Sequence, residues 1–365
     1  PVTTKMPAGF PQDTVKHKIR ALLQRNHLPE AKSLCMNLCK ENPLDAEAWF
    51  ILGAICERLG QLPEADKYCR KVIKLQPHYA IAHYNHGIVL FRMGKLDKAT
   101  SCFRRAIQLK PDFAEAYNDL GNTLAAAGRH TQAADAFRQS LKLKPELLPA
   151  HIQLGVSLQQ SGQTEDALAC HENTLHRLKE LTTAQASANE YRPFLAKLHF
   201  HIANIQFDCQ AYQDAEINYR KSLQYNPTDA EALNNLGNTL KAMHDVSSAI
   251  DSYRSALAIS PDYAAAHTNL GVALRDTRQL HDALDSAQMA VQIDKGFVEG
   301  FHNLANILQD LHRHSEAEAS YMTALGIKPA FADAETGLGN ALLSQGRATE
   351  AIEHLRKATR IAEDN

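Results

Sequence analysis

The sequence predicts an all-α fold, a right-handed α-solenoid superhelix of about ten helix-turn-helix repeats, on three observations. The stretch from Asp229 to Pro261 recurs along nearly the whole chain with a period of 34 residues. Small residues and prolines return at fixed places in this period. Apolar residues recur at spacings of three and four, which places them on one face of a helix. A fixed period of 20 to 50 residues is the signature of a stacked repeat fold.

Three kinds of residue mark each repeat. A small residue follows an apolar one at Gly53, Gly87, Gly121, Gly155, Ala203, Gly237, Gly271, Ala305 and Gly339. Alanine stands twelve positions later, at Ala65, Ala99, Ala133, Ala167, Ala215, Ala249, Ala283, Ala317 and Ala351. A proline closes most repeats, at Pro43, Pro77, Pro111, Pro145, Pro227, Pro261 and Pro329, and Lys295 replaces it once.

In these marks the chain resembles the tetratricopeptide repeat (TPR) family. Most repeats match L-G-x-x-[YL] in the first half, A-x-x-x-[FY] in the second half and a terminal proline. The resemblance covers roughly residues 12 to 362. It implies two packed helices in each repeat and a groove along the first helices.

The two helices can be placed within one repeat. Tyr117, Leu120 and Leu124 lie on one face of a predicted first helix. A predicted second helix runs through Ala133 and Phe137, and the following proline ends it. A glycine at the contact point allows the two helices to approach closely. Turns such as Arg92-Met93-Gly94 join them.

The predicted organisation has four segments. Residues 1–11 contain three prolines and no periodicity, which predicts an extended or disordered N-terminal arm. Repeats 1–5 occupy residues 12–175, and the first of them is degenerate. Repeats 6–10 occupy residues 193–365.

The segment from 176 to 192 interrupts the period. Gly155 and Ala203 are 48 residues apart, which is 14 more than one period. We expect the preceding helix to continue to about Glu180 and a loop to follow Leu181 up to Pro193. Two interpretations stay open: a tolerated surface insertion, or a hinge or partner contact between the two sets of five repeats.

Both chain ends leave questions open. After the last repeat the sequence ends at Asn365 without a polar capping helix. This predicts either a longer protein or closure by a partner. The partner could be a second copy that associates through the uncapped C-terminal repeat. Because the chain begins with Pro1, an N-terminal signal stays an open alternative to the cytoplasmic location that we expect.

Composition excludes several functions. Of the 365 residues, 44% are hydrophobic and 22% are charged, and the net charge is −2. Such a chain has no basic excess to bind a phosphate backbone, so we expect no nucleic acid partner. No apolar run reaches the roughly 18 residues of a membrane span. The seven cysteines are irregularly spaced, which favours free thiols in a reducing compartment.

No catalytic, cofactor or metal motif is found. The sequence lacks a phosphate-binding glycine loop, a G-x-S-x-G elbow, H-E-x-x-H and C-x-x-C. The 18 histidines include the near pairs His83/His86, His199/His201 and His312/His314. These spacings do not bring three ligands together, so we interpret the histidines as packing or solvated residues. We expect no enzymatic activity, no metal and no cofactor.

The candidate binding residues are asparagines of the first helices. With the small residue at position eight of a repeat, helical geometry directs positions 2, 5, 6, 9, 12 and 13 to the groove. Asparagine occupies position six at Asn85, Asn235, Asn269 and Asn303, and position nine at Asn122, Asn204, Asn238, Asn306 and Asn340. Asp119, Gln153 and His201 interrupt the series at position six. Arg58 and Arg92 flank aromatic residues of the early repeats, where we expect apolar pockets.

An asparagine side chain matches the C=O and N–H of an extended peptide. The series resembles the asparagine ladder in the TPR half of the O-linked N-acetylglucosamine transferase family. The alternative is that these amides bond to neighbouring helices. The clamp that binds chaperone tails is not expected, since it needs lysine at position five and none is found there.

The sequence therefore predicts a non-catalytic protein-protein interaction scaffold that binds extended peptides or partner proteins in its groove. The rival hypothesis is the substrate-recruiting half of a larger glycosyl- or sulfo-transferase, with catalysis beyond Asn365. If the amides serve only the groove, joint replacement of Asn235, Asn238, Asn303 and Asn306 by alanine should weaken peptide binding and leave the melting temperature nearly unchanged.

Overall fold

The computed structural model describes residues 13–184 and 188–363, and in these ranges the chain forms twenty α-helices and no strand. This confirms the predicted all-α repeat fold. The helices are α1 (Asp13–Gln24), α2 (Leu28–Glu41), α3 (Ala46–Arg58), α4 (Leu62–Leu75), α5 (Ala80–Arg92), α6 (Leu96–Leu109), α7 (Ala114–Ala126), α8 (His130–Leu143), α9 (Leu148–Gln160), α10 (Thr164–Ala184), α11 (Ala188–Asp208), α12 (Tyr212–Tyr225), α13 (Ala230–Ala242), α14 (Val246–Ile259), α15 (Ala264–Asp276), α16 (Leu280–Ile293), α17 (Val298–Asp310), α18 (His314–Ile327), α19 (Ala332–Ser344) and α20 (Ala348–Glu363). The predicted arm, residues 1–11, lies outside the described residues.

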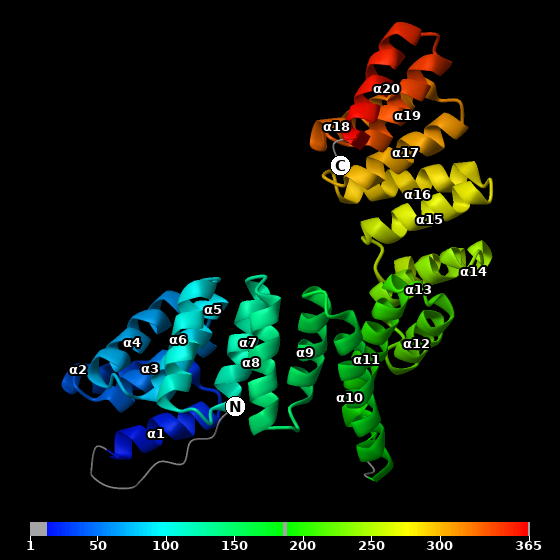
Figure 1. The fold of residues 1–365 in the computed structure, drawn as a ribbon. Coiled ribbons are helices and arrows are strands. Elements are labelled where there is room, and N and C mark those ends of the chain that lie inside the picture. The colour runs from blue at the N-terminus through cyan, green and yellow to red at the C-terminus, as the bar shows by residue number, and fades with distance from the viewer. Residues whose placement is uncertain (1–12, 185–187, 364–365) are drawn as a thin grey trace. The chain divides into compact units, whose positions relative to one another are not determined.

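The chain divides into two parts, an N-terminal part that ends at Thr174 and a C-terminal part that begins at Leu175. The division falls inside α10. Within each part, helix pairs follow one another along the chain (Figure 1). Each odd-numbered helix is the first helix of a repeat, and the even-numbered helix after it is the second.

First helices form a continuous row in each part. In the N-terminal part α3 contacts α5, α5 contacts α7, and α7 contacts α9. In the C-terminal part the same contacts join α11, α13, α15, α17 and α19. Comparable contacts between successive second helices are not found among the described residues. The first helices are thus the more closely spaced row, and they line the inner side of each stack.

A glycine against an aromatic ring fixes the close approach of the two helices. A Cβ atom placed on Gly87 would lie 2.7 Å from the ring of Phe103, and one on Gly121 would lie 2.7 Å from the ring of Phe137. Since real Cβ atoms do not come this close to other atoms, only glycine fits at these positions. The predicted role of the position-eight glycine is confirmed here.

The repeated alanine forms the centre of each helix pair. Every member of this series is 0% exposed, from Ala65 in α4 to Ala351 in α20. A larger side chain at this place would separate the two helices, because interiors are packed without spare space.

The turns inside the repeats use left-handed backbone conformations. Gly60, Gly94, Gly128, Gly162 and Gly346 have φ between 71° and 82°. Five other turns place a residue with a side chain in the same conformation, namely Asn26, Gln210, His244, Arg278 and His312. Left-handed backbone costs such residues about 1 kcal/mol or more.

Prolines end the second helices as predicted. Helix α4 ends at Leu75 and α6 at Leu109, two residues before Pro77 and Pro111. Helix α16 has Lys295 at the proline position and still ends at Ile293. There the Oδ1 atom of Asp294 accepts a hydrogen bond from the backbone N–H of Gly296 at 2.8 Å, so a side-chain turn replaces the proline.

The extra residues after Gly155 lengthen two helices. Both α10 and α11 have 21 residues, whereas the other first and second helices of the full repeats have 13 to 16. The predicted loop from 182 to 192 is wrong over 182–184 and 188–192, which are helical, and residues 185–187 lie outside the described residues. Pro193 lies inside α11 instead of starting it.

The lengthened α11 also contacts the second helix of its own repeat, α12. Arg192 donates hydrogen bonds to the backbone carbonyls of Gln224 at 3.1 Å and Tyr225 at 3.4 Å. These carbonyls belong to the last turn of α12, where a cation is favourable because the helix dipole is negative at that end. The inserted residues therefore stabilise a helix end.

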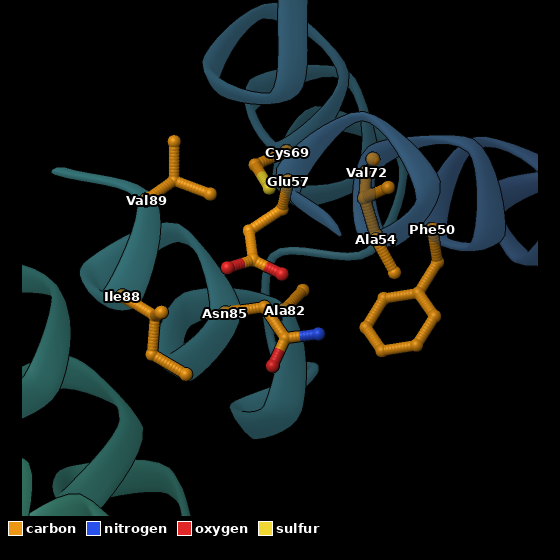
Figure 2. Close-up of a pocket in the computed structure, with 10 residues that line it drawn as sticks. Phe50, Ala54, Glu57, Cys69, Val72, Ala82, Asn85, Ile88 and Val89 are labelled. Carbon is orange, nitrogen blue, oxygen red and sulfur yellow. The ribbon is translucent and has the colours of Figure 1, made fainter. Parts of the chain in front are cut away.

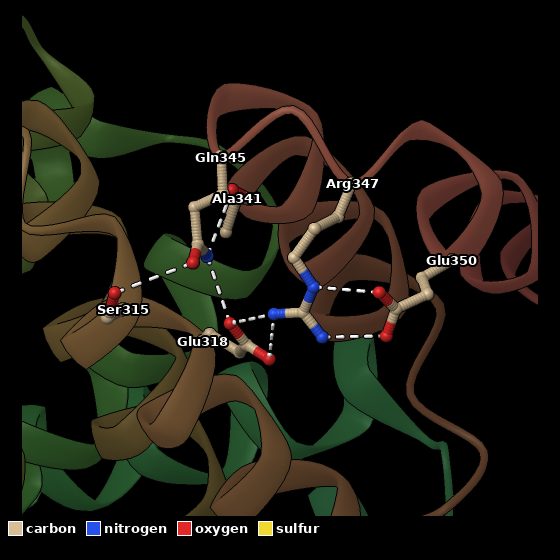
Figure 3. Close-up of polar contacts among 6 residues, drawn as sticks. All are labelled: Ser315, Glu318, Ala341, Gln345, Arg347 and Glu350. Atoms are coloured by element: carbon tan, nitrogen blue, oxygen red, sulfur yellow. Dashed lines mark hydrogen bonds and ion pairs between the residues drawn. The ribbon is translucent and has the colours of Figure 1, made fainter.

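Polar networks join successive repeats near the C-terminus (Figure 3). Arg347 donates to Glu318 on α18 at 2.7 Å and to Glu350 on α20 at 2.6 Å. Gln345 donates to the same Glu318 carboxylate at 2.9 Å. One turn between α19 and α20 is thereby held to the preceding repeat.

Candidate functional site

Position-nine asparagines serve the core as well as the surface. Asn238 on α13 accepts a hydrogen bond from the Tyr253 hydroxyl on α14 at 2.8 Å. Two more repeats have the same pair, at Asn204 with Tyr219 and Asn306 with Tyr321, each at 2.5 Å. The three tyrosine rings are at most 1% exposed. A buried hydroxyl requires an acceptor, and the asparagine oxygen supplies it.

The amides of three first helices are connected to one another. Asn269 on α15 donates to Asn234 on α13 at 2.9 Å, and Asn234 donates to its neighbour Asn235 at 3.2 Å. Asn235 donates to Asn204 on α11 at 3.3 Å. We call these four residues the amide chain. It links the first helices laterally, so the interpretation that the asparagines bond to neighbouring helices holds for them.

The structure corrects the assignment of position five to the groove in three repeats. Asn234 is 4% exposed and Thr268 is 5% exposed, and Ile152 is buried as well. Asn234 lies at the contact between neighbouring first helices, where it accepts a hydrogen bond from Asn269. A helical period gives the direction of a side chain relative to its own helix, but not the place of the next helix.

Asp119 interrupts the asparagine series and is a centre of polar contacts in the N-terminal part. It accepts hydrogen bonds from the Tyr84 hydroxyl at 2.8 Å and from Asn118 at 3.0 Å. Burial raises the pKa of Asp119 above its ordinary value, and hydrogen bonds from Tyr84, Asn118 and Asn122 oppose this effect. Asn122 is thus engaged within its own helix.

Other amides of the series keep hydrogen-bonding capacity. Asn85 is half-buried, and no hydrogen bond to its side chain is found in the described part of the chain. Asn340 is exposed, and its side chain likewise has no partner among residues 13–184 and 188–363. Asn238 uses its oxygen for Tyr253 and leaves its Nδ2 group available. Asn303 is half-buried and contacts its neighbour His302.

Both candidate arginines make polar contacts with other residues of the protein. Arg58 donates to the Asn26 side chain at 2.9 Å. Arg92 donates to the backbone carbonyl of Glu57 at 3.1 Å and forms an ion pair with the Glu57 carboxylate. Arg92 joins α5 to α3 in this way, next to an apolar pocket.

That pocket has a volume of about 90 Å³ and lies between α3, α4 and α5 (Figure 2). Phe50, Val72 and Ile88 contribute apolar walls, and Glu57 and Asn85 contribute the polar groups. The aromatic residues of the early repeats had indicated apolar pockets, and this pocket has Phe50 in its wall.

The histidines at position four make a recurring hydrogen bond that the sequence did not reveal. The Nε2 atom of His83 donates to the carbonyl of Pro77 at 2.9 Å, and His267 donates to Pro261 at 3.0 Å. Trp49 donates in the same way to Pro43 at 3.0 Å. The recurring signal is a ring N–H at position four, six residues after the proline.

One buried cluster combines a thiol, an imidazole and a carboxylate. His86 is hydrogen-bonded to Asp66 at 2.7 Å, and Cys102 lies 3.4 Å from the other ring nitrogen of His86. Burial lowers the pKa of His86 and raises the pKa of Cys102 to about 11. These contacts join α4, α5 and α6, and a raised pKa keeps the Cys102 thiol in its less reactive protonated form at neutral pH.

The described residues were also compared with the requirements of a metal site and of a membrane-spanning helix. In the described ranges, no three histidine, cysteine, aspartate or glutamate side chains gather in a way that could hold a metal ion. No described helix has the length and apolar character needed to cross a bilayer.

Paired helices with a 34-residue period, stacked through a glycine and a ring, define an α-helical repeat protein. Family models described as tetratricopeptide repeat match residues 84–147 and 302–365, 44–112 and 218–251, and one described as TPR repeat matches 245–277. Together they cover more than half of the sequence. The chain belongs to the tetratricopeptide repeat family, and such repeats support a role as a protein-interaction scaffold with protein partners.

Solved structures with detectable similarity include MamA. One MamA crystal structure is 24% identical, covers 45% of this chain and 95% of its own, and has a TM-score of 0.42. MamA from Desulfovibrio magneticus RS-1 is 18% identical, covers 47% of this chain and 97% of its own, and has a TM-score of 0.43. A comparison with curated protein sequences finds no match.

Proposed function

We propose that the surface lined by the first helices binds extended peptide segments of partner proteins and that the chain is a non-catalytic scaffold. The observation that carries this proposal is a set of half-exposed or exposed amides whose N–H groups the fold does not use, at Asn85, Asn238 and Asn340. An amide offers two donors and one acceptor to a peptide backbone, which favours binding with broad sequence tolerance.

Energetics set the scale of binding. A hydrogen bond contributes about 0.5–1.5 kcal/mol net, so a few amides supply part of a micromolar affinity and side-chain pockets must supply the rest. The alternative, a recruiting half of a larger transferase, would use the same surface for its substrate. The experiment below therefore tests peptide binding for both functions.

The test pans a phage-displayed library of random dodecapeptides against the 365-residue chain. Enriched peptides are synthesised and titrated against three variants, Asn85→Ala, Asn238→Asp and Asn340→Ala. Aspartate at 238 keeps an acceptor for Tyr253 and removes the N–H donors. Thr323→Asp, on the exposed side of the second helix α18, is the matched control for added charge.

Each enriched peptide should lose about three- to tenfold in affinity with at least one of the three variants and be unaffected by the control. A library that yields no enriched peptide contradicts the proposal. Peptides that bind all three variants as tightly as the unmodified chain contradict it as well.

A further inference from the structure

The repeat formed by α3 and α4 lacks a ring that most other repeats have. The second helix places Phe103, Phe137, His171 or Tyr253 against the position-eight glycine. In this repeat the equivalent residue is Cys69. A Cβ atom on Gly53 would lie 3.6 Å from the Cys69 sulfur, an ordinary contact distance. At Gly87, Gly121, Gly155 and Gly237 the ring comes within 2.3 to 2.7 Å of the Cβ position. Cys69 does not fill the space that a ring fills.

Another repeat with a small residue at this place closes the space differently. In the repeat of α15 and α16 the equivalent residue is Ala287, and the Cδ1 atom of Ile307 from the next first helix reaches within 3.6 Å of the Cβ position on Gly271. At Gly53 the three nearest atoms to that position belong to Tyr68, Cys69 and Ala65, all on α4. The next first helix, α5, does not close the gap there.

The gap is the pocket of about 90 Å³ between α3, α4 and α5. Gly53 and Cys69 line it together with the apolar side chains of Phe50, Val72 and Ile88 (Figure 2). Phe50, Ile88 and Asn85 are only partly buried, so the pocket opens on the surface lined by the first helices.

The polar groups at the pocket are suited to a peptide backbone. The Asn85 amide makes no hydrogen bond within the described chain and can donate to a peptide carbonyl. One oxygen of Glu57 is paired with Arg92, and the other can accept a peptide N–H. Figure 2 shows the Glu57 carboxylate and the Asn85 amide near each other at the pocket. The carboxylate disfavours an acidic side chain at this place.

The volume sets the kind of side chain. An apolar cavity of ~150 Å³ accommodates benzene, so a pocket of about 90 Å³ is small for an aromatic ring and suited to an aliphatic group. We propose that this pocket binds a leucine, isoleucine or methionine side chain of an extended peptide, with Asn85 and Glu57 bonding to the backbone beside it. This inference rests on the proposed function and names the side-chain class that the N-terminal part recognises.

Two substitutions at one position test the pocket. Cys69→Phe supplies the ring that Phe103 supplies in the next repeat, and Gly53 leaves room for it. The variant should fold with an equal or higher melting temperature, since it fills a cavity. Cys69→Ala is the matched control, because it removes the thiol and keeps the pocket open.

The first readout is nuclear magnetic resonance of the methyl groups of Val72, Ile88 and Val89, with N-acetyl-leucine-methylamide as the probe. The probe should shift these methyl signals in the unmodified chain and in Cys69→Ala, and not in Cys69→Phe. N-acetyl-alanine-methylamide should bind at least tenfold more weakly, because it lacks the buried methyl groups. Absence of shifts, or equal shifts in Cys69→Phe, would overturn the proposal.

The second readout separates the pocket from the peptide-binding function. The dodecapeptide library is panned against the unmodified chain and Cys69→Phe in parallel. Peptides with an aliphatic anchor that lose about 10- to 100-fold in affinity for Cys69→Phe support the pocket. Identical peptides with equal affinity for both chains refute the pocket and leave the proposed function intact, whereas a library without any enriched peptide refutes the proposed function.

Discussion

The hydroxyl of Tyr253 donates a hydrogen bond to Oδ1 of Asn238 at 2.8 Å, across the two helices of one repeat. The tyrosine is 0% exposed, so water cannot replace the acceptor. Asn238 is half-buried. One amide therefore satisfies a core hydroxyl with its oxygen, and its N–H groups have no partner in the described part of the chain.

This relationship predicts coupling between the two residues. Asn238→Ala should lower the free energy of unfolding by about 1–3 kcal/mol, because it leaves a buried hydroxyl without an acceptor. In the background of Tyr253→Phe the same substitution should cost less, since no hydroxyl remains. Urea denaturation of the four members of this double-mutant cycle measures the difference.

Asn340→Ala is the control, because its exposed side chain has no partner in the described chain. It should change stability by less than about 0.5 kcal/mol. Additive effects of the two substitutions at 238 and 253 would contradict the prediction. For the same reason we now expect joint alanine replacement of Asn235, Asn238, Asn303 and Asn306 to lower the melting temperature, in contrast to the expectation from the sequence alone.

The turns give a second prediction. Arg278 is exposed and has φ of 61°, a conformation that glycine adopts at the equivalent place in other repeats. Arg278→Gly should raise stability by about 0.5–1 kcal/mol, because relief of left-handed strain exceeds the entropic cost of glycine. Gly128→Ala is the mirror test: no atom lies near its Cβ position, so any loss of stability comes from its φ of 72°. Thermal denaturation should show a higher melting temperature for Arg278→Gly and a lower one for Gly128→Ala. Shifts of the same sign in both variants would contradict the prediction.

The sequence period predicted the packing of the repeats in detail. Gly87 and Phe103 stand at fixed places of the period, and the structure brings them into contact as expected for a glycine at a helix crossing. Prolines and turn glycines likewise end and begin helices where the period places them. These features depend on residues within one repeat or its direct neighbour, which is why a single sequence reveals them.

The partners of the amides could not be predicted in the same way. Helical geometry gives the direction of Asn238 but not the reach of a tyrosine fifteen residues later on another helix. The loop expected before Pro193 was wrong because α11 begins five residues before this proline, at Ala188. Proline usually marks a helix boundary, and a single sequence does not show that this one lies inside a helix. The pocket at Cys69 required a comparison of residue size across repeats together with the position of Ile307.

A third prediction concerns pH. Burial lowers the pKa of His201 from 6.5 to about 4. The folded chain therefore binds fewer protons than the unfolded chain between these values, and stability falls as the pH decreases from about 6.5 toward 4. By pH 5 the loss from this residue should be about 2 kcal/mol.

His201→Asn places at position six the amide that Asn235 and Asn269 have in later repeats. Denaturant unfolding at pH 7 and pH 5 should show a smaller decrease for this variant than for the unmodified chain. Part of the decrease should persist, because burial also lowers the pKa of His86, His199 and His302. An identical decrease in both proteins would show that His201 titrates normally.

The cysteines give the last prediction. Burial raises the pKa of Cys56, Cys102 and Cys170 to about 11 and that of Cys69 to about 12, whereas Cys209 is exposed at the end of α11. Because the thiolate is the reactive form, iodoacetamide at pH 8 should alkylate Cys209 at least tenfold faster than these four residues in the native chain. Mass spectrometry of peptides after timed quenching measures the rates, and Cys209→Ser should remove the fast phase. Urea should equalise the remaining rates, since it removes the burial that raises the pKa values; fast native labelling of Cys102 would instead show that its contact with His86 activates it.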